Sequence, residues 1–167
     1  LFAGSGSYTG GLVLEADQSL IGQGVDLILG GSTLVAATSR PLFVDGLALA
    51  QDNTVRGLDI GSNAAGNMLL GSGISSLSMD NAKISGNGGI QLDGGALSVT
   101  LDHLVSSNAP SHGVQLDNLS GDLTVTGFTR VIAPGASGIA LNTSPGFTGS
   151  FGDTLVSNAG SAVLAAG

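Results

Sequence analysis

The chain contains no cysteine, and only 10% of its 167 residues are charged. Without cysteine it cannot be a disulfide scaffold, a cysteine-ligated zinc finger or a thiol enzyme. No apolar run approaches the ~20 residues that a membrane-spanning helix needs. Basic residues are also scarce: four stand against 12 acidic ones, which gives a net charge of −8. This balance disfavours both nucleic acids and anionic membrane surfaces as partners, because each requires several Lys or Arg contacts.

Glycine and aliphatic residues, by contrast, are abundant. Glycine accounts for 29 residues, more than twice the usual share of about 7%. Disordered chains are also rich in glycine and serine, but they have low hydrophobicity. Here 42% of the residues are hydrophobic and the mean hydropathy is +0.41, so disorder is excluded. The length suits one domain.

Three groups of residues recur along the chain with a period of 21 to 25 residues, which indicates a repeat architecture. The first is a central aliphatic residue, at Ile90, Val114, Ile139 and Val163 with spacings of 24, 25 and 24, preceded by Met68. The second is an aliphatic residue followed by asparagine, at Ile60 and Asn63, Ile84 and Asn87, Val105 and Asn108, and Val156 and Asn158. One coil between Asn108 and Asn158 lacks this asparagine, and residues 131–134 stand where it is expected. The third is a short alternating run, at 77–80, 99–102, 124–127 and 150–153.

The residues between these positions predict strands. Apolar and polar residues alternate over about four residues, which is the strand period. Gly, Asn, Asp and Ser bound each run, as turns require, and no segment has helical periodicity with caps. An Asn-Gly hairpin turn does not recur from coil to coil, so equivalent positions once per coil favour a parallel β-solenoid over a hairpin array. In such a stack, columns of like charge would repel and corners favour Gly, which accounts for the composition.

The N-terminal third is less regular. We expect residues 20–24 to be a turn-bearing connection, and strands or aliphatic runs of the first coils at 12–17, 25–29, 33–37, 42–44 and 47–51. Residues 1–24 are therefore assigned to an irregular or first-coil segment and residues 25–167 to the regular coils. The chain starts at Leu1 without a signal-peptide pattern and ends at Gly167 within a repeat. We expect a piece of a longer exported protein, with its open end covered by more coils, a partner chain or self-association.

Several segments together resemble a known fold family; they are residues 12–29, 55–63, 82–92 and 104–116. They are similar to the right-handed parallel β-helix of the pectate-lyase-like superfamily, and more narrowly to the β-strand-repeat regions of bacterial adhesins and autotransporter passengers. The resemblance covers roughly residues 12–167. It implies an all-β, right-handed parallel β-helix, for which we expect about six coils, at an extracellular or outer-surface location. It does not imply an activity, because this fold carries lyases, hydrolases and inert stalks alike.

One polar column is a candidate metal site. Asp93, Asp117 and Asn142 recur with spacings of 24 and 25 residues and could gather a Ca²⁺ ion, which takes about six to eight oxygen ligands. The alternative, which we favour, is a ladder of polar turn residues at one corner. A pectate-lyase reaction also needs a basic residue to abstract a proton, and no arginine aligns with this column, since Arg130 belongs to a different strand position.

Glycosidase chemistry has weaker candidates. The chain has Ser-His-Gly at 111–113 and Asp-Asn-Thr at 52–54, where polygalacturonase-like hydrolases have Gly-His-Gly and Asn-Thr-Asp. Asp80 and Asp102 are predicted to share one column, and glycosidic carboxylates stand ~5–9.5 Å apart. Isolated aspartates at turns more often form Asx turns. His103 and His112 are expected on different faces, which excludes a metal pair.

Other charged residues predict only surface contacts. Asp52 with Arg56, and Asp80 with Lys83, repeat an acid–base offset of three or four residues. We expect each pair to form an exposed ion pair that contributes less than ~1 kcal/mol.

These observations favour a structural role. We expect a rigid stalk or adhesive segment of an extracellular bacterial surface protein, without catalytic residues and without a cofactor other than the candidate Ca²⁺. The alternative is a polysaccharide-binding or polysaccharide-degrading β-helix. Glycan binding requires exposed aromatic residues, and for Phe147 and Phe151 we favour core packing. The expected partners are other parts of the parent protein or neighbouring chains at the solenoid ends, and host or environmental glycans.

Overall fold

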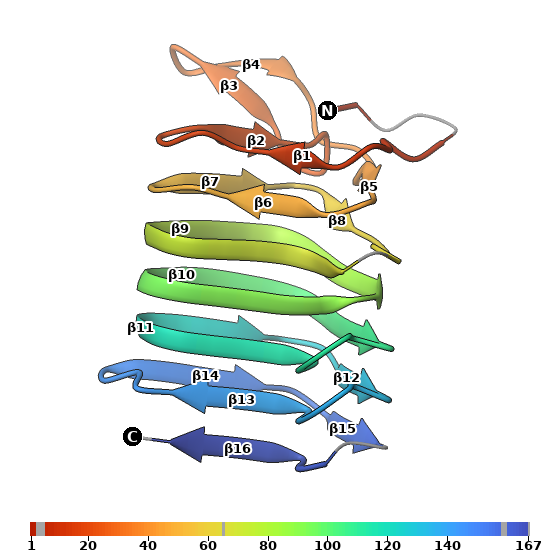
Figure 1. Cartoon of the computed structure of the whole chain (residues 1–167). Coiled ribbons are helices and arrows are strands. Elements are labelled where there is room, and N and C mark those ends of the chain that lie inside the picture. The colour runs from red at the N-terminus through yellow and green to blue at the C-terminus, as the bar shows by residue number, and fades with distance from the viewer. Residues whose placement is uncertain (3–5, 65, 158–159, 167) are drawn as a thin grey trace.

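The computed structural model of the chain describes residues 1–2, 6–64, 66–157 and 160–166. It is an all-β parallel β-solenoid of about five turns, and no described residue is helical (Figure 1). No helix long and apolar enough to cross a membrane occurs in the described part of the chain. The fold class predicted from the repeats is therefore confirmed.

The strands stack into three faces, and every pair between coils is parallel. The first face contains β1 (Leu12–Val13), β6 (Leu47–Leu49), the starts of β9 (Asn67–Asn87), β10 (Gly89–Ser107) and β11 (Val114–Val125), then β13 (Ile139–Asn142) and β16 (Val163–Ala166). The second face contains β2 (Ser19–Ile21), β7 (Asn53–Arg56), the middles of β9 and β10, the end of β11, and β14 (Phe147–Phe151). The third face contains β5 (Leu42–Phe43), β8 (Asp59–Ile60), the ends of β9 and β10, β12 (Thr129–Ile132) and β15 (Thr154–Ser157).

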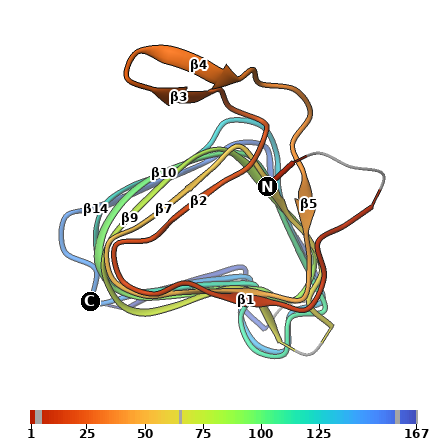
Figure 2. The same cartoon turned by 90° about the horizontal axis from the view of Figure 1, so that it is seen from above.

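Seen along the axis, the coils superpose in a roughly triangular outline (Figure 2). The chain runs clockwise while it moves away from the N-terminal end, which is the right-handed sense (Figures 1 and 2). The sequence predicts about six coils, and the structure has about five turns. The first coil is interrupted between β2 and β5. Of the last turn, the structure describes a single strand, β16.

The first group of repeated aliphatic residues forms one column. Ile90, Val114, Ile139 and Val163 are successive Cα partners, as their spacing predicts. Met68 does not continue this column, because a register shift between Gly89 and Ile90 pairs Ile90 with Leu69 instead. Both Met68 and Leu69 are buried, since the chain bulges there with two apolar residues inside.

The asparagine positions form a partial ladder at another corner. Nδ2 of Asn108 donates a hydrogen bond to Oδ1 of Asn87 at 3.2 Å. Asn108 has a φ of 50°, and Ala133 takes nearly the same φ, 49°, in the next coil. Asn158 lies outside the described residues. The aliphatic partner in this repeat is Leu104 rather than Val105, because Leu104 pairs with Ile84.

A single thin core runs through the stack. Inward aliphatic residues from the three faces make one cluster, in which Ile60, Ile84 and Leu104 are at most 1% exposed. Fully burying one such side chain stabilises the fold by ~1.5–3 kcal/mol. Each coil contributes only a few of these residues, so the core forms only when coils stack.

Glycine at the corners answers a steric need, as the composition predicts. Gly95 has a φ of 130°, and a Cβ there would lie 2.6 Å from the carbonyl oxygen of Ser75. Gly121 has a φ of 78°, and a Cβ there would overlap the carbonyl oxygen of Leu97. Only glycine satisfies both the backbone angle and the close approach of successive coils.

The region between β2 and β5 departs from the prediction. β3 (Leu27–Leu29) and β4 (Ser32–Val35) form an antiparallel hairpin outside the coils, whereas the sequence pattern assigns both runs to coils (Figure 2). Gly30 and Gly31, with φ values of 59° and 80°, make the two-residue turn that reverses the chain. The predicted connection at 20–24 is also partly wrong, because β2 includes Leu20 and Ile21 and pairs with β7.

Both ends of the stack expose apolar strand residues. Val13 of β1 is 74% exposed, and Val163 of β16 is 57% exposed. Val163 occupies the column of Ile139, which is buried because it has a neighbouring coil on each side.

Candidate functional site

The column of Asp93, Asp117 and Asn142 exists as predicted. Asp93 is the Cα partner of Asp117, and Asp117 is the partner of Asn142, at the outer end of the first face. The three residues are half-buried. They come together because successive coils place the same sequence position one above another, ~4.8 Å apart.

Amide groups surround the carboxylates of this column. Asp117 accepts one hydrogen bond from Nε2 of Gln115 and one from Nδ2 of Asn142, both at 2.6 Å. Asp93 accepts one from Nδ2 of Asn118 at 2.8 Å. A calcium ion requires oxygen atoms in these directions rather than N–H donors. Ca²⁺ binding here stays a prediction, and the amide orientation favours the polar ladder.

The corner between the second and third faces carries the densest group of charges. We call Arg40, Asp59, Asn81, Lys83 and Asp102 the Arg40 cluster. Nε of Arg40 lies 2.8 Å from Oδ1 of Asp59, and Nζ of Lys83 lies 2.9 Å from Oδ2 of the same carboxylate. A guanidinium nitrogen of Arg40 also contacts Asp102 and donates a hydrogen bond to Oδ1 of Asn81 at 3.2 Å.

The Arg40 cluster joins four successive coils along the axis. Arg40 precedes β5, and its partners belong to the next three coils of the third face. Nδ2 of Asn81 donates a further hydrogen bond to the carbonyl oxygen of Gly24, at the base of the hairpin. Each carboxylate in the cluster is neutralised by a cation. The arrangement therefore stabilises the stack and offers no free acid–base pair.

The predicted carboxylate pair is not formed. Asp102 does not share a column with Asp80, because Met79 pairs with Val99 and Ala82 with Leu101. Asp80 instead forms a two-point ion pair with Nε of Arg56, at 2.8 and 3.0 Å. The glycosidase interpretation of these two aspartates is thus not supported by the geometry.

The predicted ion pairs within one coil are wrong. Arg56 pairs with Asp80 of the following coil instead of with Asp52, and Oδ1 of Asp52 accepts a hydrogen bond from the hydroxyl of Ser76. Lys83 pairs with Asp59 of the preceding coil. Side chains of successive residues in one strand point to opposite faces, and those further along the strand are too far apart to pair. The side chain at the same position in the next coil is much closer.

The two histidines occupy different parts of one coil: His103 lies in β10, and His112 lies in the loop between β10 and β11. The rings of His103 and Phe128 form a T-shaped pair with centroids 4.2 Å apart, and the guanidinium of Arg130 lies over the Phe128 ring, 4.9 Å from its centroid. Nδ1 of His112 accepts a hydrogen bond from the backbone N–H of Ser137 at 3.2 Å. The described residues contain no group of three or more His, Asp or Glu side chains suited to a metal ion.

Among the described aromatic residues, Phe2 is 60% exposed, whereas the two phenylalanines considered for glycan binding offer little free surface. Phe147 and Phe151 are half-buried and pack against the core, as we favour from the sequence. The ring of Phe128 contacts Arg130 over its face and forms a T-shaped pair with His103.

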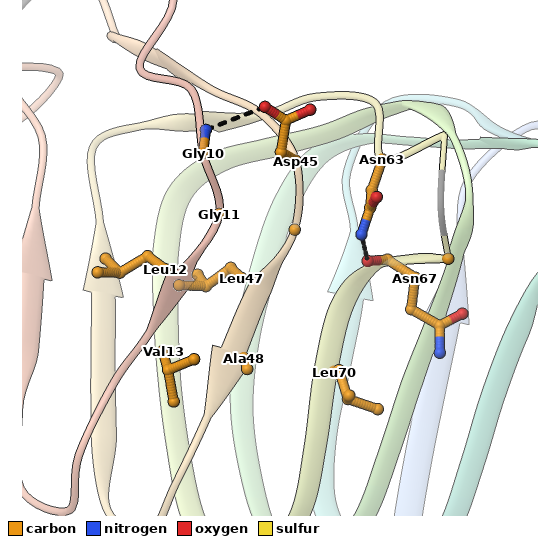
Figure 3. Close-up of a pocket in the computed structure, with 12 residues that line it drawn as sticks. Gly10, Gly11, Leu12, Val13, Asp45, Leu47, Ala48, Asn63, Asn67 and Leu70 are labelled. Carbon is orange, nitrogen blue, oxygen red and sulfur yellow. Dashed lines mark hydrogen bonds between the residues drawn. The ribbon is translucent and has the colours of Figure 1, made fainter.

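An open depression of about 540 Å³ lies where the first three coils meet, at the corner between the third and first faces (Figure 3). Its floor is an outward column of aliphatic residues that includes Val13 and Leu70. Its polar rim is already hydrogen-bonded: Asp45 accepts from the N–H of Gly10 at 3.0 Å, and Asn63 donates to the carbonyl of Asn67 at 2.8 Å. The described residues that line it include one carboxylate, that of Asp45, and no hydroxyl, thiol, amine or imidazole side chain.

The fold and these contacts define the chain as a parallel β-solenoid whose polar groups are engaged mainly between coils. No protein-family model, curated protein or solved structure matches the chain significantly. Sequence reasoning missed the Arg40 cluster, because Arg40 lies 62 residues before Asp102 and outside the recognised repeats. Pro41, which directly follows Arg40, is a local signal of a turn but does not indicate which charges Arg40 meets.

Proposed function

We propose that this chain is a rigid structural or adhesive segment of an extracellular bacterial surface protein, comparable to the β-strand-repeat regions of adhesins and autotransporter passengers. It keeps the parts of the protein at its two ends a fixed distance apart and presents its outer surface for binding. It performs no catalysis. The observation that carries this proposal is the continuous aliphatic core through successive coils, of which Ile90, Val114 and Ile139 form one buried column. A stack of this kind bends little, because each inner coil is hydrogen-bonded to both of its neighbours.

The use of charge supports the same role. Three of the four cations, Arg40, Arg56 and Lys83, are engaged in ion pairs that join coils. A catalytic groove would instead direct carboxylates and bases towards a shared open space. The depression of Figure 3 has a single carboxylate among its described lining residues, that of Asp45, which accepts a hydrogen bond from the N–H of Gly10.

Spin-label distances test the rigidity. Thr54 and Thr148 belong to one outward column of the second face, four coil steps apart, which corresponds to ~19 Å of backbone separation. The chain has no native cysteine, so a Thr54→Cys/Thr148→Cys variant carries only the two labels. We expect a narrow distance distribution in the folded protein and a broad one in urea. A broad distribution in the folded protein would rule out a rigid spacer.

A turnover assay tests the enzymatic alternative. The purified chain is incubated with polyuronates and neutral polysaccharides, with Ca²⁺ and with a chelator, and reducing ends and unsaturated products are measured. We expect no turnover with any substrate. Turnover that is lost in an Asp117→Asn variant would replace the structural proposal with polysaccharide cleavage.

A further inference from the structure

The hairpin β3–β4 is a described element that the stack of coils does not hold by strand pairing. Within the described part of the chain its two strands pair only with each other, and it projects beyond the outline of the coils (Figure 2). We call residues 22–41 the hairpin segment. Its two connections, residues 22–26 and 36–41, form no strand. Strand pairing therefore fixes the fold of the hairpin but not its angle to the solenoid.

Packing against the first coil does not fix this angle either. A largely apolar space of about 110 Å³ is lined by Val25, Leu27 and Val35 of the hairpin segment and by Ile21 and Phe2. Leu27 lines this space and is still 40% exposed. Close-packed interiors leave few voids larger than a water molecule. An element with such a space beside it is therefore free to shift unless other contacts hold it.

The side chain of Arg40 lies across the base of the hairpin segment. The returning chain carries Arg40 itself, directly before Pro41 and β5. The outgoing chain passes the same side chain at Gly24, where a Cβ would overlap Cγ of Arg40. The N–H of Gly24 also donates to the carbonyl oxygen of Gly57 in the second coil at 2.9 Å. Both connections of the hairpin thus meet at one arginine.

The side-chain amide of Asn81 joins these two connections to a central coil. Its Oδ1 accepts a hydrogen bond from a guanidinium nitrogen of Arg40 at 3.2 Å, and its Nδ2 donates to the carbonyl oxygen of Gly24 at 2.8 Å. Asn81 belongs to β9. The carboxylates of Asp59 and Asp102, from the coils before and after β9, hold the same guanidinium. A planar guanidinium presents several donors in a fixed geometry, which suits it to join three acceptors at once.

We propose that Arg40, Asp59, Asn81 and Asp102 form an ionic clasp that holds the hairpin at a fixed angle to the solenoid, and that high ionic strength releases it. On release the hairpin turns about its two connections, and the coils stay stacked because their strands pair with each other. Salt acts on the clasp because the Asp102 side chain is 44% exposed, and the Debye length falls to ~3 Å at ~1 M salt. The clasp does not rest on the proposed function.

Spin-label distances between the hairpin and the solenoid test the clasp. The chain has no native cysteine, so a Ser32→Cys/Ser98→Cys variant carries one label on β4 and one on the exposed side of β10. We expect a narrow distance distribution at low salt. It should broaden in ~1 M NaCl, and it should be lost at low salt when Arg40→Met is added. In the Arg40→Met background, salt should cause no further broadening, because the ion pairs that it screens are absent.

Two further variants separate the clasp from a general loss of charge. Arg56→Met is the matched control, since that side chain pairs with Asp80, and it should keep the narrow hairpin distribution. Asn81→Gly removes the bridging amide without changing the charge, suits the φ of 47° at this position, and should broaden the distribution.

The label pair at positions 54 and 148 monitors the coils and should stay narrow in Arg40→Met. If it broadens together with the hairpin pair, the cluster holds the stack rather than the hairpin, and the clasp is refuted. A hairpin distribution that is broad in the unaltered background, that stays narrow in Arg40→Met, or that broadens equally in Arg56→Met would refute it as well. A broad coil distribution without Arg40→Met would instead count against the rigid spacer alone.

Discussion

The central coils and the first coil are built from similar residues, but the central coils are far more regular in structure. β9 and β10 run through all three faces almost without interruption, and their inward side chains are almost completely buried. In the first coil the strands β1 and β2 have two and three residues, and the chain leaves the stack to form the hairpin β3–β4. A central coil has a neighbour on each side, whereas the first coil has a described neighbour on one side only. The difference shows that coil stability here comes from neighbours rather than from local sequence.

The strongest test of this comparison uses one column that passes through both regions. Leu20, Val55, Met79, Val99 and Leu123 are successive partners on the second face. Leu123→Ala should destabilise the fold by ~2–5 kcal/mol, because it leaves a cavity between two coils. Leu20→Ala, in the half-buried first coil, should cost less than about half as much. Urea unfolding measures both, and equal costs would contradict the role of neighbouring coils.

A second test compares two glycines with positive φ. Gly121→Ala in a central coil should cost ~2 kcal/mol or more, because the left-handed conformation costs ~1–2 kcal/mol and the new Cβ overlaps the carbonyl oxygen of Leu97. Gly30→Ala at the hairpin turn meets no atom within 4 Å and should cost only the conformational part. Thermal unfolding of the two variants checks this order. A larger loss for Gly30→Ala would show that the hairpin contributes more to stability than the corners do.

The Arg40 cluster joins the irregular region to the central coils, and it can be removed. Arg40→Met should destabilise the chain by about 1–3 kcal/mol, because it leaves the half-buried Asp59 with one cation instead of two. Arg56→Met is the control: that side chain is half exposed and, among the residues that the structure describes, pairs only with Asp80, so its loss should cost less than ~1 kcal/mol. Urea unfolding at low salt measures both. If Arg40→Met costs no more than Arg56→Met, the cluster is a surface feature only.

The smallest expected effect is a gain of stability. Ala133 has a φ of 49° at the position that Asn108 occupies one coil earlier. Ala133→Asn should stabilise the fold by ~0.5–1 kcal/mol, because asparagine tolerates the left-handed region and can extend the ladder from Asn87. Ala133→Gly separates the two contributions, since it relieves the backbone without adding an amide. A rise of the thermal midpoint in the asparagine variant alone would assign the gain to the ladder.

The repeat period predicts the fold and most columns of stacked residues, but it does not predict every residue pairing between neighbouring coils. Between β9 and β10 the separation of partners falls from 21 residues at Leu69 and Ile90 to 19 at Ala82 and Leu101. Bulges at the corners absorb this difference, and they carry no distinct sequence signal. For that reason Met68 and Val105 are assigned to columns one residue away from their true partners, and Asp80 is wrongly aligned with Asp102.

The candidate polar column was predictable, and the ion pairs were not. Asp93 and Asp117 align because no bulge separates β10 from β11 in the described register. Arg40 reaches Asp59 and Asp102 across successive coils, and local offsets in the sequence say nothing of such contacts. Long side chains at a corner extend along the axis, so their partners depend on the stacking of whole coils.

The sequence by itself determined the period, the inward aliphatic positions, the need for glycine at corners and the scarcity of charge. These properties are local, because alternation, turn chemistry and repulsion between stacked like charges act over a few residues or one coil. Only the tertiary structure decided where the first coil opens into a hairpin, where bulges shift the register and which charges meet. Those features depend on how closely the backbones of neighbouring coils approach each other. They are therefore decided by contacts between residues that are far apart in the sequence.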